Sequence, residues 1–85
     1  MSAPITVRLF AGAAEAFGGE SARVPSTVGT TVGDVVAVLV ANGGPGTADV
    51  LGRCSFLVAG VRADGAATPV APGAQLDVLP PFAGG

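Results

Sequence analysis

Histidine, lysine, tryptophan and tyrosine are absent from this 85-residue chain, which also has a single cysteine. Without histidine the chain lacks the commonest general base and the usual side-chain ligand for a metal ion. Cys54 alone can form neither an internal disulfide bond nor a cysteine cluster for zinc, and its apolar neighbours predict a small core residue. These absences argue against an autonomous active site, so whether the chain acts as an enzyme depends on a partner.

Charge is also scarce, since 12% of the residues are charged and the net charge is −2. The four scattered arginines form no basic stripe, which argues against nucleic acid as a partner. The longest apolar run, residues 35–41, is far shorter than the roughly 20 residues that cross a membrane. The first residues lack the basic start and apolar segment of a signal peptide. We therefore expect a cytoplasmic protein with neither nucleic acid nor a membrane as its partner.

The apolar residues, 49% of the chain, are enough for one globular domain, and their spacing predicts a mixed α+β order. Alternation over residues 5–10 predicts a strand, followed by a short helix at 13–17 and a second strand at 20–25. Residues 56–58 and 61–62 predict a hairpin around Ala59-Gly60, and residues 76–79 a final strand.

The main helix is predicted to begin after Thr31, a plausible N-cap, with Asp34 completing an approximate capping box. Apolar residues at Val32, Val35 and Leu39 give it one buried face, together with Val36. The glycine-rich residues 42–46 stop this helix and lack the residues of a phosphate-binding loop, and residues 47–51 add one further turn.

The chain ends in Pro80-Pro81-Phe82-Ala83-Gly84-Gly85. The two prolines stop the last strand, and the two glycines have no side chain, so the end of the chain can enter a narrow channel. Six extended residues reach at most about 20 Å. This ending is typical of a tail inserted into the active site of another protein, although in a chain with 14 glycines it is also compatible with a simple fraying end.

Three segments resemble the bacterial ubiquitin-like sulfur carriers. They are the opening Val7-Arg8-Leu9-Phe10-Ala11, the helix start at residues 31–35, and the stretch from Gly73 through the Pro-Pro-Phe-Ala-Gly-Gly ending. The ending is the specific part and is most similar to that of the small subunit of molybdopterin synthase. The resemblance implies a β-grasp domain over residues 1–79, with a mixed sheet of about four to five strands on one main helix and the first and last strands as parallel neighbours. Residues 80–85 would be a flexible tail.

The resemblance also implies the chemistry. An E1-like adenylating enzyme would use ATP to activate the C-terminal carboxylate of Gly85, next to Gly84, and a sulfur donor would convert it to a thiocarboxylate. The sulfur would then pass to a pterin precursor in the large subunit of molybdopterin synthase. The carrier itself would bind no cofactor. The alternatives are a carrier for thiamine or cysteine biosynthesis, a protein modifier, and an interaction module without chemistry. The absence of lysine argues against a modifier that builds chains of itself.

If the first and last strands are parallel neighbours, Phe10 and Leu79 both lie near the exit of the tail, on the face away from the helix. With Phe82 they would form an exposed apolar patch. We therefore predict a partner-binding surface, unless a loop or a dimer contact covers it. Its residues are Phe10, Leu79, Pro80, Pro81, Phe82 and Ala83.

Overall fold

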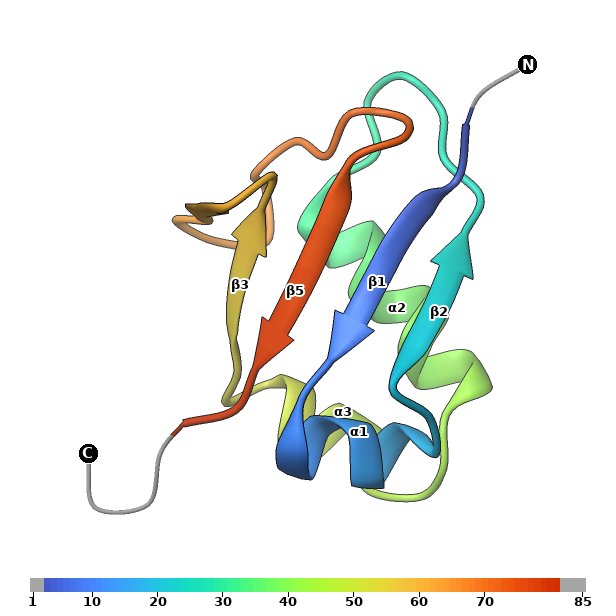
Figure 1. The fold of residues 1–85 in the computed structure, drawn as a ribbon, viewed down its shortest axis with the longest axis vertical. Helices are drawn as coiled ribbons and strands as arrows, with labels where there is room; N and C mark the ends of the chain where they lie inside the picture. Colours follow the sequence, from blue (N-terminus) through green and yellow to red (C-terminus); the bar gives the residue numbers. More distant parts are fainter. Residues whose placement is uncertain (1–2, 82–85) are drawn as a thin grey trace.

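The computed structural model describes residues 3–81, which form five strands and three helices (Figure 1). In chain order they are β1 (Ile5–Leu9), α1 (Ala11–Phe17), β2 (Ser21–Val24), α2 (Val32–Asn42), α3 (Thr47–Leu51), β3 (Ser55–Val58), β4 (Val61–Arg62) and β5 (Gln75–Leu79). The strands form one mixed sheet in the order β2-β1-β5-β3-β4. The predicted β-grasp fold is confirmed.

The first and last strands are parallel neighbours in the middle of the sheet, as predicted. Thr6 of β1 lies opposite Gln75 of β5, and Leu9 lies opposite Val78. The antiparallel neighbours β2 and β3 flank this pair, and β4 forms a hairpin with β3. Because β1 and β5 run in the same direction, both end at the same edge of the molecule (Figure 1).

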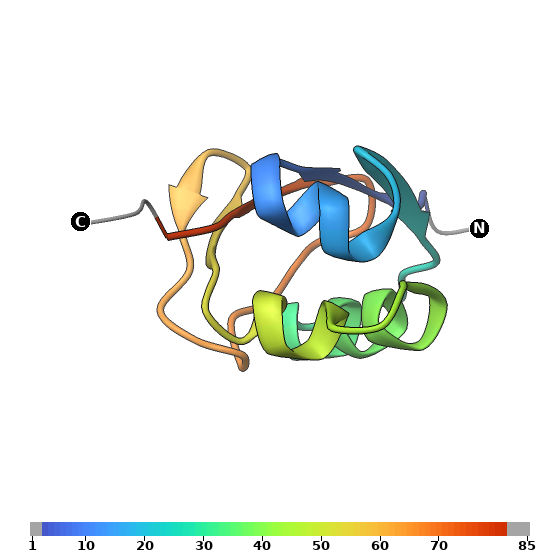
Figure 2. The ribbon, with the colours of Figure 1, turned by 90° about the horizontal axis from the view of Figure 1, so that it is seen from below.

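The molecule has two layers, with the sheet above and the helices α2 and α3 below it (Figure 2). Side chains of β1 alternate strictly between buried and exposed, so its apolar residues point towards the helices. The core between the layers consists of Ile5, Val7, Leu9, Ala13, Val24, Val32, Val35, Leu39, Leu51, Val70, Leu76 and Val78. The opposite face of the sheet, called the outer face below, is not covered by any helix of the described residues.

The main helix α2 begins as its sequence predicts. The hydroxyl of Thr31 accepts a hydrogen bond from the backbone N–H of Asp34 (3.2 Å), and the carboxylate of Asp34 accepts one from the N–H of Thr31 (2.9 Å). This capping box satisfies two backbone donors at the helix start. The helix ends at Asn42, with Gly43 of the glycine-rich stop as its C-cap, and α3 supplies the predicted further turn.

Two boundaries differ from the prediction at the end of β1. The strand ends at Leu9 rather than residue 10, and α1 begins at Ala11 rather than residue 13. The cause is a left-handed backbone at Ala11 (φ 48°), which turns the chain so that the N–H of Ala13 donates to the carbonyl of Phe10 at 3.0 Å. Phe10 is therefore the N-cap of α1.

Candidate functional site

The last strand delivers the chain to the edge of the domain. On one side the N–H of Phe10 donates to the carbonyl of Val78 (3.2 Å), and on the other Leu79 lies opposite Ser55 of β3. Leu79 and Pro80 are half-buried, and Pro81 is exposed. The start of the predicted tail is therefore held by a central strand with neighbours on both sides. Phe82, Ala83, Gly84 and Gly85 lie outside the described residues, and the predictions that concern them stay predictions.

Phe10 lies at the same edge and is 38% exposed. Its neighbour Leu9 is buried opposite Val78, so the next residues along the two strands, Phe10 and Leu79, come side by side with their side chains on the outer face. A surface hollow of about 310 Å³ adjoins Phe10 and is bordered by Arg8, Leu9, Ala11, Ala14 and Glu20. The described part of the predicted partner-binding surface is thus assembled at one edge.

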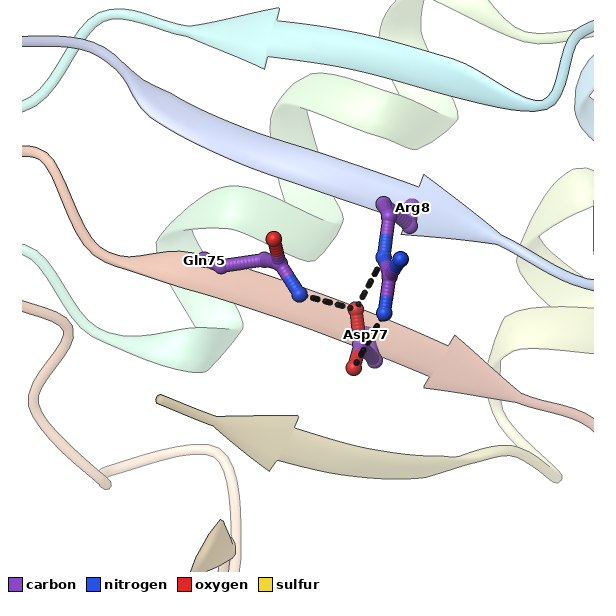
Figure 3. A network of polar contacts seen from close by, with 3 residues as sticks. All are labelled: Arg8, Gln75 and Asp77. Atoms are coloured by element: carbon purple, nitrogen blue, oxygen red, sulfur yellow. Dashed lines mark hydrogen bonds and ion pairs between the residues drawn. The ribbon is translucent and has the colours of Figure 1, made fainter. Parts of the chain in front are cut away.

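An ion pair between the two central strands lies next to this surface (Figure 3). Arg8 and Asp77 are opposite each other in the register, and Nε and Nη2 of Arg8 donate to the two carboxylate oxygens of Asp77 at 3.0 and 3.3 Å. The amide of Gln75 donates to the same carboxylate at 3.1 Å. Asp77 is 8% exposed as a residue, whereas the Arg8 side chain is 52% exposed.

The ion pair with Asp77 and one further contact hold Arg8 in place. The hydrogen bonds from Arg8 to Asp77, and then the negative charge of Asp77, raise the pKa of Arg8 above its usual value, so the guanidinium stays charged. Its central carbon lies 5.4 Å from the centre of the Phe10 ring, within reach of a cation–π interaction. The sequence analysis did not identify this pair. The sequence feature that could have revealed it is an arginine and an aspartate, Arg8 and Asp77, at outward-facing positions of two strands expected to be neighbours.

Cys54 lies at the edge of the core, in agreement with the small packing role that its neighbours predict. Its thiol donates to the carbonyl of Val50 at 3.2 Å, and the side chain packs against the buried cluster. Burial raises the pKa of the Cys54 thiol, which lowers its reactivity at neutral pH. It borders a second hollow, of about 380 Å³, on the helix side between the start of α2 and residues 62–66.

Within the described residues, no three of the side chains His, Cys, Asp and Glu gather in a way that could hold a metal ion. No helix in that part of the chain is long and apolar enough to cross a membrane.

The fold and sequence are similar to those of several known proteins. The HVO 2177 protein of Haloferax volcanii is 32% identical over 99% of this chain and 88% of its own, with a TM-score of 0.79. Small archaeal modifier protein 1 of the same organism is 29% identical over 94% of this chain and 99% of its own, with a TM-score of 0.80. No curated protein matches this chain in sequence.

A more distant structure shares the fold alone. It is the complex of subunits 1 and 2 of molybdopterin-converting factor from Helicobacter pylori, in which the matching chain is 23% identical over 96% of this chain and 99% of its own, with a TM-score of 0.68. The ThiS family model matches residues 7–85, from the middle of β1 to the final glycine. This match covers almost the whole β-grasp domain, whose central last strand leads into the Pro-Pro-Phe-Ala-Gly-Gly ending. The chain therefore belongs to the ThiS family of ubiquitin-like sulfur carriers.

Proposed function

We propose that this protein carries sulfur as a thiocarboxylate on Gly85 and donates it to a pterin precursor, as the small subunit of a molybdopterin synthase. The observation that carries the proposal is the position of β5, which is hydrogen-bonded between β1 and β3 and continues directly into Pro80 and Pro81. A central strand gives the reactive end a rigid base, and the prolines stiffen the exit. The domain then serves to hold and present the tail.

The chemistry follows from the state of the terminal group. A free α-carboxyl has a pKa of about 3.3–3.7, so at neutral pH Gly85 is an anion and a poor electrophile. An adenylating enzyme overcomes this when the carboxylate attacks the α-phosphorus of ATP and pyrophosphate leaves. A sulfide nucleophile then attacks the activated carbonyl carbon and displaces AMP, which leaves the sulfur on Gly85 as the thiocarboxylate. No side chain at Gly85 blocks either face of the activated carbonyl.

The second half of the cycle transfers the sulfur. The thiocarboxylate sulfur attacks an electrophilic carbon of the pterin precursor and displaces an oxygen leaving group from it, and water then cleaves the bond between the Gly85 carbonyl and the sulfur. This restores the carboxylate and leaves the sulfur on the precursor. We expect the partner to supply the acids, bases and substrate pocket, because the chain has no histidine and its six carboxylates are scattered along the sequence. The molybdopterin-converting factor of Helicobacter pylori, which consists of two different subunits in its complex, supports a large-subunit partner.

A second candidate function is protein modification, in which Gly85 forms an amide bond with an amine of a target protein. The 29% identity to a protein named small archaeal modifier protein 1 favours this candidate. Since the chain has no lysine, the accepting amine would belong to another protein or to the N-terminus. A carrier for thiamine or cysteine biosynthesis would use the same thiocarboxylate with a different acceptor.

The test is to incubate the purified protein with an E1-like adenylating enzyme, ATP and a sulfur source, and to measure its intact mass. We expect an increase equal to the difference between a sulfur and an oxygen atom. Oxidation adds nearly the same mass, so alkylation with iodoacetamide must locate the new sulfur. Cys54→Ala removes the one competing thiol, and burial, which raises the pKa of Cys54, lowers the labelling of this thiol in the unaltered chain.

Two variants serve as controls. Deletion of Gly85 and extension by one alanine should each abolish sulfur transfer, because both misplace the carboxyl, while the unfolding midpoint stays unchanged. A labelled sulfur that persists in either variant would overturn the proposal. Adducts joined through an amide bond to other proteins, without a thiocarboxylate intermediate, would favour the modifier instead.

A further inference from the structure

The second hollow, of about 380 Å³ on the helix side of the sheet, takes no part in the proposed function. Its floor is apolar and is formed by Val32, Val36, Leu51 and Phe56. Its outer wall is the segment 62–66, which packs closely on α2 because Gly33 has no side chain: a Cβ atom there would lie 3.2 Å from Cβ of Ala66. Hollows of this size with an apolar floor and a few polar groups at the rim are typical of binding sites.

The polar groups of this hollow include one positive charge. Among the described residues that border it, Arg62 is the one cation, and it forms no ion pair with any residue from 3 to 81. The N–H groups of Val32 and Gly33, at the start of α2, already donate to backbone carbonyls at 2.9 Å. Asp64 borders the same hollow, also without an ion pair in that part of the chain. A carboxylate that enters the hollow would therefore be attracted by Arg62 and repelled by Asp64.

The end of β5 lies beside this hollow. Leu79 is opposite Ser55 of β3, and both Ser55 and Cys54 border the hollow. The segment that follows β4 runs from the sheet to the helix layer on the side of the molecule where β5 ends (Figure 2). The chain beyond Leu79 therefore starts next to the rim of the hollow.

The spacing of the strands allows the end of the chain to reach Arg62. Strand β3 lies between β5 and β4, and Leu57, which pairs with Arg62, is two residues along β3 from Ser55. Strand spacings of about 4.8 Å and a rise of about 3.3 Å per residue place the Cα atoms of Leu79 and Arg62 about 12 Å apart. The six residues that follow Leu79 span at most about 20 Å, which leaves enough length for a turn.

The chemistry of the ending matches that of the hollow. Phe82 supplies an aromatic ring for the apolar floor, and burial of such a ring is favourable. Gly85 carries the terminal carboxylate, which is ionised at neutral pH and is an acceptor suited to the guanidinium of Arg62. Ala83 and Gly84, between these two residues, have small side chains or none, so they can follow the rim closely.

We propose that residues 82–85 fold back onto this hollow in the free protein, with Phe82 on the apolar floor beside Cys54 and the carboxylate of Gly85 paired with Arg62. This contact goes beyond the sulfur-carrier function and does not depend on it. It shields the terminal carboxylate until a partner binds the tail. Because an ion pair at the surface contributes little free energy, a partner can release the tail easily.

Cys54 is a natural probe of this contact, because it borders the hollow and is the one thiol of the chain. The experiment measures the rate at which iodoacetamide alkylates Cys54, by intact mass, in the purified chain without enzyme or ATP. A chain that ends at Pro81 should react at least about threefold faster than the full chain, the ratio for a tail that is seated about two-thirds of the time. Phe82→Ala in the full chain should also react faster.

The ion pair is tested through the protection of Cys54, defined as the rate in the chain that ends at Pro81 divided by the rate in the full chain. Each variant is compared with its own shortened form, so that a direct effect of the substitution on the thiol cancels. Arg62→Gln should lower the protection, and Asp64→Asn should raise it because a repulsion is removed. Arg23→Gln is the matched control: Arg23 is also exposed, but it lies on β2 at the opposite edge of the sheet, and the protection should not change.

Equal rates in the full and shortened forms of the unaltered chain would overturn the proposal. Protection that Arg62→Gln leaves unchanged would overturn it as well, because the carboxylate would then lie elsewhere. Protection that increases with protein concentration would mean that the tail of a second copy occupies the hollow, which contradicts a contact within one chain. Since no enzyme takes part, these results are independent of the sulfur-carrier function, which the thiocarboxylate measurement tests.

Discussion

At the scale of single residues, Arg8 and Asp77 meet although 69 positions separate them in the chain. Their contact requires the parallel register of β1 and β5, which places them directly opposite each other. The two residues are unequal: the carboxylate of Asp77 is nearly buried, whereas half of the Arg8 side chain is exposed. Loss of the arginine therefore leaves a buried carboxylate with Gln75 as its remaining side-chain partner.

This asymmetry predicts a specific pattern of stabilities. Arg8→Met should lower the free energy of unfolding, because Asp77 keeps its charge without its main partner. Replacing both residues, as Arg8→Met with Asp77→Leu, should recover most of that loss, since two apolar side chains need no partner. Urea denaturation of the three proteins tests this. A double variant that is less stable than Arg8→Met would show that the pair contributes more than the removal of an isolated charge.

At the scale of elements, local signals predicted most of the structure. Thr31 and Asp34 predict the start of α2, because the residues of a capping box lie close together in the chain. The hairpin is equally local: Ala59 and Gly60 link the paired residues Val58 and Val61, and both have positive φ (49° and 83°). Two-residue turns with positive φ at both positions favour Asn-Gly, so Ala59 is a poor choice for its conformation.

Ala59→Asn should therefore stabilise the protein, by about 0.5–1 kcal/mol, because asparagine tolerates the left-handed region better than alanine. Thermal or urea unfolding measures the effect. Ala59→Val is the opposite control and should destabilise the protein, since a β-branched side chain fits this region worst. Equal stabilities for all three proteins would mean that the turn relaxes to a different conformation.

At the scale of the whole molecule, the sequence predicted the individual strands and helices better than it predicted which strands pair. The β-grasp arrangement, with β1 beside β5, followed from the resemblance of residues 7–11, 31–35 and 73–85 to a known family rather than from periodicity, which does not reveal which strands pair. The edge that joins Phe10 to Leu79 could be predicted once that pairing was assumed. The ion pair of Arg8 was missed because it depends on the register, and a one-residue shift would turn either side chain to the other face.

The contact that links α3 to α1 also could not be predicted from the sequence. Thr47, which is 1% exposed, lies at the start of α3, and its hydroxyl is 2.6 Å from the carbonyl of Gly44 and 3.0 Å from that of Ala16 in α1. The N–H of Gly44 also donates to the carbonyl of Phe17 at 3.3 Å. One buried hydroxyl thus links the segment between α2 and α3 to α1, which lies at the end of the sheet (Figure 1).

Thr47→Val keeps the shape of this side chain and removes its hydroxyl, so the carbonyl groups of the half-buried residues Ala16 and Gly44 lose the donor that they share. We expect it to lower the free energy of unfolding by about 1–3 kcal/mol. Thr6→Val is the matched control, because Thr6 is exposed on the outer face and its substitution should change the stability by less than about 0.5 kcal/mol. Urea denaturation compares the two. Equal small effects would mean that water replaces the lost hydroxyl.

The parallel pairing of β1 with β5 has a mechanical consequence. A force that pulls the chain at Leu79 away from its start at Ile5 acts along both strands at once, so the hydrogen bonds between them are loaded in shear and must break together rather than one by one. The domain should therefore resist unfolding when its carboxyl end is pulled, and it should yield far more easily to a force on the hairpin of β3 and β4, whose hydrogen bonds open one after another.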